Sequence, residues 1–155
     1  MTKPTLPTIP FKSPKSFETW LEKQHHKSTG IWMKIYKKDS GIKTITYAEA
    51  LDVALCFGWI DGQKQAFDEE CWLQKFCPRT TKSIWSKVNI GHVERLIKND
   101  KMRPAGLKAI ESAKADGRWE KAYDSPSKMT IPEDFLKVLS KNKKAATFFK
   151  SLNKT

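Results

Sequence analysis

Asp61 is the residue whose type and setting most clearly suggest chemistry in this chain of 155 residues. It follows Trp59 and Ile60 and precedes Gly62, so its carboxylate lies beside large apolar side chains where the backbone can bend. Partial desolvation there would raise the pKa of the carboxyl group and would suit a ligand anchor or a general base. The alternative is an Asp-Gly turn or bulge, in which the Asp61 side chain caps backbone amides.

A second group of candidate ligand-binding residues follows Pro78 and combines cations, hydroxyl groups and an aromatic side chain. Its members are Arg79, Lys82, Ser83, Trp85, Ser86 and Asn89. The cations and the backbone amides of a helical first turn could hold an anion, while Trp85 would supply an aromatic wall. Together with Trp59 and Asp61, this group forms the predicted ligand-binding site.

Structural roles are the alternative for the same residues. Arg79 could form an ion pair with Asp61 or Asp52 and so tie a hairpin to the second half of the chain. Ser86 or Asn89 would then be a helix N-cap. A third hypothesis makes Asp61 an acid or base and Arg79 the group that stabilises negative charge. Because no complete catalytic set can be assembled around them, we predict no catalytic residue and favour a protein that is not an enzyme.

The three cysteines and three histidines lack the short spacings of a metal site. Cys71 and Cys77 are six residues apart in one predicted strand, and a separation of roughly 20 Å is too long for a disulfide. Cys56 lies in an apolar helical stretch and is predicted to be a packed thiol. We therefore expect no metal and no cofactor, and we expect reduced thiols in a bacterial-type cytosol.

The formal net charge of +12 is concentrated in the second half of the chain. Residues 1–78 carry 11 Lys and Arg against 9 Asp and Glu, whereas residues 79–155 carry 18 against 8. A basic half of this kind could bind nucleic acid, anionic lipid or an acidic protein surface, or it could be a solvated lysine-rich face. No apolar run approaches the length of a transmembrane helix, so we expect a single domain without a membrane span.

The first half of the chain predicts a small antiparallel sheet over about residues 30–77. Alternating apolar residues indicate a strand over 31–37, and two further strands over 59–67 and 71–76 would form a hairpin. Residues 1–12 contain three prolines and are predicted to form an extended arm.

One helix is predicted before the strand over 31–37 in the sequence, and another is predicted after it. Apolar residues recur at helical spacing over 14–25. Thr46 and Glu49 form a capping-box pattern for a helix that ends near Phe57, where Gly58 can take the left-handed conformation.

The second half of the chain is predicted to be helical throughout. Helices would begin near Asn89, at Pro104 and after the capping-box pattern from Thr130 to Glu133. The expected fold class is therefore α+β, a small antiparallel sheet packed with helices and followed by a helical C-terminal half.

Several ordered stretches are long enough to compare with a known family. They are Phe17 to Leu21, Tyr36 to Gly41, Tyr47 to Asp52, Phe57 to Gly62, Phe76 to Arg79, Lys82 to Asn89, Met102 to Leu107 and Ala113 to Trp119. By these motifs the chain resembles the YdeI/OmpD-associated family, whose members are described as bacteriocin-protection proteins. The resemblance implies one domain over 1–155 and a role in tolerating antimicrobial peptides or envelope stress, with no settled reaction. Family members continue into a basic helical tail that a chain ending at Thr155 lacks, so functions of that tail are not expected here.

The favoured interpretation is a cytoplasmic binding module that holds a small anionic molecule or a peptide near Asp61, Arg79 and Trp85. It would act in stress tolerance or bacteriocin protection through a partner protein. The main alternative is a nucleic-acid-binding protein that uses the basic half, for which binding would fall steeply with salt.

Overall fold

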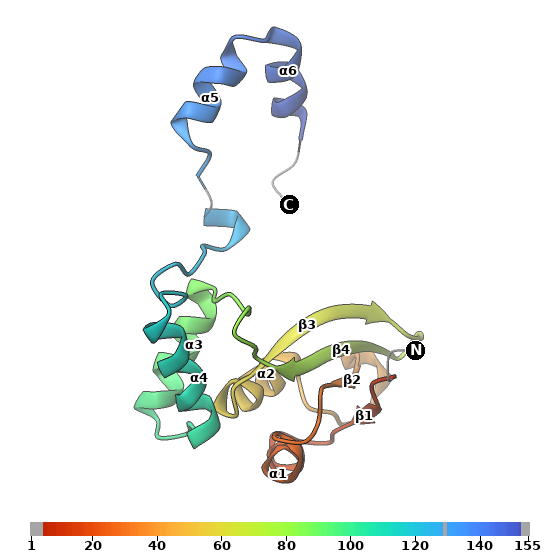
Figure 1. Ribbon diagram of the computed structural model, residues 1–155. Helices are drawn as coiled ribbons and strands as arrows, with labels where there is room; N and C mark the ends of the chain where they lie inside the picture. The colour runs from red at the N-terminus through yellow and green to blue at the C-terminus, as the bar shows by residue number, and fades with distance from the viewer. Residues whose placement is uncertain (1–4, 129, 153–155) are drawn as a thin grey trace.

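The computed structural model describes residues 5–128 and 130–152 of the chain (Figure 1). The strands are β1 (Thr8–Pro10), β2 (Ile31–Tyr36), β3 (Trp59–Ala66) and β4 (Cys71–Pro78). The α-helices are α1 (Pro14–Gln24), α2 (Tyr47–Cys56), α3 (Lys87–Lys98), α4 (Pro104–Ala115), α5 (Glu133–Ser140) and α6 (Lys143–Ser151). A sheet packed with helices and a helical second half confirm the predicted α+β fold.

The sheet has four strands in the order β1-β2-β4-β3. The strands β2 and β3 pair with β4 in antiparallel register, as predicted. The N-terminal segment differs from the predicted extended arm, because Thr8–Pro10 forms a strand that pairs in parallel with β2. The sheet is therefore mixed rather than purely antiparallel. Proline lacks an N–H group and is tolerated at a sheet edge, so Pro10 is compatible with this short edge strand. The remainder of the predicted arm includes residues 1–4, which lie outside the described residues.

The main core lies between the sheet and the helices α1 and α2, which cover the same face of the sheet (Figure 1). Alternation along β2 turns Ile31, Met33 and Ile35 into this core. Phe17 of α1 and Phe76 of β4 meet there with their ring centroids 5.8 Å apart. The position of α2 therefore follows from burial of its apolar stripe against the sheet.

The predicted helix starts and stops of the first half are confirmed. Ser13 and Thr46 cap α1 and α2 through capping boxes, with Pro14 at the first position of α1. Gly58 has a φ of +73°, and a Cβ atom there would lie 2.9 Å from the carbonyl oxygen of Ala105. A glycine is therefore required both by the left-handed backbone and by the close approach of α4.

The predicted helix caps of the second half are confirmed only in part. Of the two N-caps considered for α3, Ser86 is confirmed and Asn89 is wrong, because the Ser86 hydroxyl accepts a hydrogen bond from the Asn89 backbone amide. The second capping box does not form, because α5 begins after Pro132 without a side-chain cap. Since Pro132 has a fixed φ, it can precede the helix directly and makes the Thr130 cap unnecessary.

A second, smaller core joins α3 to α4. It contains Trp85, Val93, Ile110 and Ala113, with Trp119 packed against Trp85 at a centroid distance of 5.1 Å. The helices α5 and α6 pack against each other and stand apart from the rest of the chain (Figure 1). Across residues 5–128 and 130–152, helices with the length and apolar character needed to cross a bilayer are absent.

Candidate functional site

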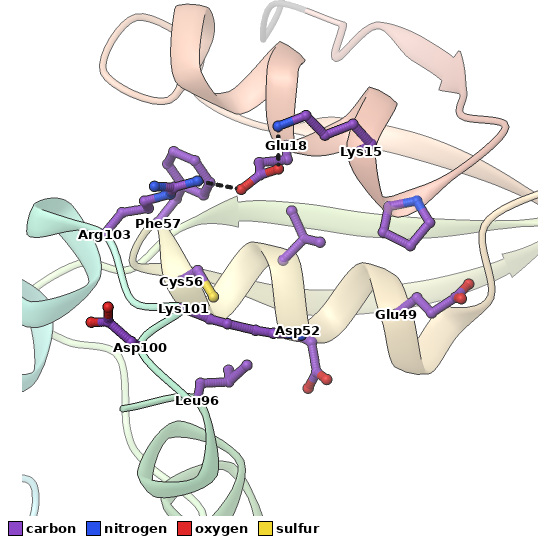
Figure 2. A pocket seen from close by; sticks show the side chains of 12 residues that line it. Lys15, Glu18, Glu49, Asp52, Cys56, Phe57, Leu96, Asp100, Lys101 and Arg103 are labelled. Atoms are coloured by element: carbon purple, nitrogen blue, oxygen red, sulfur yellow. Dashed lines mark hydrogen bonds and ion pairs between the residues drawn. The ribbon is translucent and has the colours of Figure 1, made fainter. Parts of the chain in front are cut away.

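A groove of about 530 Å³ lies between α1, α2 and the loop that joins α3 to α4 (Figure 2). It is lined by Pro14, Lys15, Glu18, Glu49, Asp52, Val53, Cys56, Phe57, Leu96, Asp100, Lys101 and Arg103. This volume falls in the usual range for small-molecule sites in proteins. The groove is therefore the candidate ligand site of this fold.

One face of α2 forms the floor and one side of the groove. Glu49, Asp52, Val53 and Cys56 recur at the spacing i, i+3, i+4 and i+7, which places them on one helix face. The neighbouring face carries the buried residues that pack on the sheet. The same helix thus serves the core with one face and the groove with the next.

The opposite side of the groove depends on the loop from Asn99 to Arg103. The Arg103 amide donates to the carbonyl oxygen of Cys56 at 3.0 Å, and this bond holds the loop against the end of α2. The Lys101 amide donates to Leu96 at 3.0 Å and closes the end of α3. These two hydrogen bonds position the loop backbone from which the charged side chains of Lys101 and Arg103 extend.

Glu18 is the centre of an ion-pair network along the upper side of the groove (Figure 2). Its carboxylate accepts hydrogen bonds from Lys15, at 2.9 Å, and from Arg103. The bond from Lys15 and the bond from Arg103 both lower the pKa of Glu18 below its ordinary value. Arg103 also lies 3.8 Å from Glu22, so this side of the groove carries paired charge.

Lys101 and Asp100 differ from Glu18 because they form no ion pair with the residues that the structure describes. Figure 2 shows the Lys101 side chain extending from the loop toward Asp52 on α2. The Asp52 carboxylate is held by Arg95, at 2.7 Å. The Lys101 ammonium is therefore a charge along the groove that is free for a ligand.

Cys56 contributes a thiol to the apolar floor of the groove. Burial raises its pKa to about 11, and the nearby charge of Asp52 acts in the same direction. The thiol is protonated near neutral pH, and the residue is 7% exposed, which confirms the predicted packed thiol. All three cysteines are free.

A smaller cavity of about 240 Å³ adjoins the groove. It shares Phe57 and Arg103 with the groove and adds Glu22, His25, Pro104 and Ala105. Arg103 therefore lies at the border of two hollows. Its Nε atom is buried and has no hydrogen-bond partner among the described residues.

Neither of these two cavities is lined by any of the eight residues of the predicted ligand site. Trp59 is 1% exposed and packs edge-to-face on Trp20, so it belongs to the core rather than to a ligand wall. Lys82 is exposed. The Ser83 hydroxyl accepts the Thr80 amide at 2.8 Å and stabilises the loop that follows β4.

Asp61 accepts a hydrogen bond from the hydroxyl group of Tyr47, the first residue of α2. Burial and this bond to a carboxylate raise the pKa of Tyr47. The register of β3 against β4 shifts between Asp61 and Lys64, as the predicted bulge requires. The carboxylate, however, binds the hydroxyl of α2 instead of capping backbone amides.

Arg79 lies over the ring of Trp85, with the guanidinium carbon 3.5 Å from the ring centroid. Its Nη1 atom donates to the carbonyl oxygen of Ile84 at 3.1 Å. The predicted ion pairs with Asp61 and Asp52 do not form, although the charge of Asp61 still favours the cation. Burial lowers the pKa of Arg79 to about 10.

Two donors of Arg79, Nε and Nη2, are buried and have no acceptor in the described part of the chain. The indole Nε1 of Trp85 is also buried and has no acceptor among the described residues. Buried donors without acceptors are uncommon in folded proteins. The cation and the aromatic ring of the predicted site thus come together, while the groove lies elsewhere.

A protein-family model described as Domain of unknown function (DUF8412) matches residues 9–109. The matched range begins in β1 and ends within α4, so it includes every residue that lines the groove. A search of curated proteins and a search of solved structures give no significant match.

Proposed function

The chain belongs to the family described as a domain of unknown function (DUF8412), and from its groove we propose that it is a binding module for short peptides. The observation that carries this proposal is the combination of an apolar floor with charges of both signs along the sides. Val53, Cys56 and Leu96 supply the floor. A peptide with an apolar side chain and two charged termini matches that combination.

The charges also indicate how such a peptide would be held. The Lys101 ammonium is free to bind a carboxylate terminus. Asp100, which also forms no ion pair within the described part of the chain, is the corresponding carboxylate for an amino terminus. Glu18 and Arg103 are already paired with each other, so they shape the side of the groove and leave recognition to Asp100 and Lys101.

Leucyl-leucine is the probe that tests this proposal. We expect the dipeptide with free termini to raise the melting temperature of the full chain, because a ligand that binds only the folded state stabilises it. The N-acetylated and C-amidated forms lack one charge each and should raise it less. In the variant Lys101→Gln the affinity should fall by about tenfold, as expected for loss of one charged hydrogen bond.

Lys98→Gln is the matched control, since Lys98 is exposed, ends α3 and does not line the groove. It should respond to leucyl-leucine like the wild type. An equal response to the free and capped dipeptides, or an unchanged affinity in Lys101→Gln, would contradict the proposal.

The biological setting forms part of the same proposal. The resemblance to the YdeI/OmpD-associated family implies tolerance of antimicrobial peptides, and a peptide-binding groove supplies a physical means for it. Three free cysteines suit a reducing cytoplasm.

A second candidate function is the binding of a small anion by Arg79. The observation that favours it is the pair of buried guanidinium donors without an acceptor, beside the ring of Trp85. An anion such as phosphate would satisfy these donors and would stabilise the charged form of a group whose pKa is lowered by burial.

The variant Arg79→Met distinguishes the anion site from a structural role. Inorganic phosphate should raise the melting temperature of the wild type but not of Arg79→Met. Without phosphate, the variant should be at least as stable as the wild type, because methionine keeps apolar contact with Trp85 and removes a buried charge. Arg95→Met is the control for charge, and it should keep the phosphate response. A phosphate response that survives in Arg79→Met would reject this candidate.

A further inference from the structure

The helices α5 and α6 form a hairpin whose large apolar side chains remain exposed. Phe135 and Phe149 make an edge-to-face contact between the two helices, at a centroid distance of 5.4 Å. Neither helix has a buried residue. The exposed apolar residues of the hairpin and its ends are Ile131, Phe135, Leu136, Val138, Phe148 and Leu152.

Both helices of the hairpin are amphipathic. In α5 the apolar residues are Phe135, Leu136, Val138 and Leu139, which lie on one side of the helix. In α6 and at its C-cap, Ala145, Phe148, Phe149 and Leu152 follow the spacing i, i+3, i+4 and i+7. Val138 and Phe148 are both 67% exposed. An ordered apolar face of this kind requires a cover that the hairpin itself does not supply.

The charge of the hairpin is strongly positive and comes from lysine alone. Residues 128–151 contain six lysines against two carboxylates, both of which lie at the start of α5. The polar face of α6 carries Lys143, Lys144 and Lys150 and has no acidic residue. The apolar face and the lysines therefore occur on the same short element.

From these features we propose that the α5–α6 hairpin docks onto an anionic phospholipid surface. Amphipathic helices with lysine on the polar face and Phe and Leu on the other lie in the plane of a bilayer interface. Their apolar side chains enter the acyl boundary, while lysine side chains extend to the phosphate groups. The net charge of +12 on the whole chain would guide it to the same surface.

Other partners fit these observations less well. A second copy of the chain would bring two molecules of charge +12 together, and their repulsion opposes such a dimer. A nucleic acid could pair with the lysines, but it offers no apolar environment for the exposed faces of Val138 and Phe148. Of these three partners, an anionic lipid surface is the one that meets both the charge and the apolar face.

Vesicle co-sedimentation of the full chain tests this proposal. We expect the chain to bind vesicles of phosphatidylcholine mixed with phosphatidylglycerol, and to bind vesicles of phosphatidylcholine alone far more weakly. Val138→Ser combined with Phe148→Ser should abolish binding without unfolding the protein, because both side chains are already exposed. Lys143→Gln, Lys144→Gln and Lys150→Gln together should weaken binding by on the order of 100-fold at low salt.

Matched controls separate the hairpin from the rest of the surface. Ile84→Ser removes an apolar side chain that is 69% exposed outside the hairpin, and it should leave vesicle binding unchanged. Lys12→Gln, Lys27→Gln and Lys43→Gln lower the net charge equally and should weaken binding much less. Equal binding to both kinds of vesicle would overturn the proposal. A hairpin variant that binds vesicles like the wild type would also overturn it. A concentration-dependent dimer that is lost in Phe148→Ser would identify a second copy of the chain as the partner instead. If the chain does not bind vesicles but retains DNA, and this retention is lost with the lysines of α6, the partner is a nucleic acid.

Discussion

Replacing Gly106 with alanine is expected to lower the free energy of unfolding by about 3 kcal/mol. A Cβ atom at this position would lie 2.2 Å from the carbonyl oxygen and 2.7 Å from the carbonyl carbon of Cys56. These are backbone atoms at the end of α2, so they cannot move as the end of a flexible side chain can. The Arg103 amide also binds the same carbonyl oxygen at 3.0 Å. An alanine would therefore push α4 away from α2 and disturb the groove.

Urea unfolding measures this effect, and Gly91→Ala provides the control. Gly91 lies inside α3, and a Cβ atom there would meet no atom within 4 Å among the described residues. Because glycine is a poor helix former, Gly91→Ala should stabilise the protein by about 0.5–1 kcal/mol. If the two variants unfold at the same urea concentration, the close contact between α2 and α4 is not rigid.

The pair of glycines at Gly58 and Gly106 illustrates what local sequence signals could predict. Gly58 was expected at the end of α2 for its left-handed backbone, and the structure confirms that reason. The second reason for a glycine here is the close approach of α4. Local sequence signals could not predict it, because it depends on contact between segments about fifty residues apart in the chain. The requirement at Gly106 arises only from that meeting, so no local pattern indicated it.

The groove was missed for the same physical reason. Its sides come from α1, α2 and the loop after α3, which become neighbours only through packing of the core. One signal was present in the sequence. Val53 and Cys56 extend the pattern of α2 beyond the stripe that packs on the sheet, and they predict a second partly apolar face. This face of α2 by itself predicts only that another part of the chain packs against it. The charged loop after α3 is needed to turn the face into a ligand-binding groove.

The predicted site was only partly assembled, and strand geometry explains why. Trp59 and Asp61 are two residues apart in β3, so both face the helices that cover the sheet. Trp59 therefore entered the core, and Asp61 met Tyr47 of α2 instead of solvent. Arg79 follows β4 and turns toward the second core, where it stacks on Trp85. The spacing of these residues along the chain indicates which residue types could share a site, but it does not indicate the direction in which each side chain points.

Replacing Trp59 with alanine is expected to lower the free energy of unfolding by about 4 kcal/mol, in the range for large buried aromatic residues. Trp59 is among the largest fully buried side chains of the protein, and its indole nitrogen donates to the carbonyl oxygen of His25 at 3.4 Å. The alanine variant would leave a cavity beside Trp20 and remove that bond. Trp59→Phe should cost less, because most of the volume remains filled.

The same variants decide between a core role and a ligand role for Trp59. Phe67→Ala is the control, since Phe67 is 51% exposed and its loss should change the unfolding free energy by only about 0.5 kcal/mol. If Trp59 formed the wall of a ligand site, Trp59→Phe would unfold like the wild type and lose its response to phosphate. We expect the opposite pattern, with the phosphate response of Arg79 retained in Trp59→Phe and the stability reduced. That pattern follows because Trp59 belongs to the main core and faces α1, whereas Arg79 lies over Trp85 of the second core.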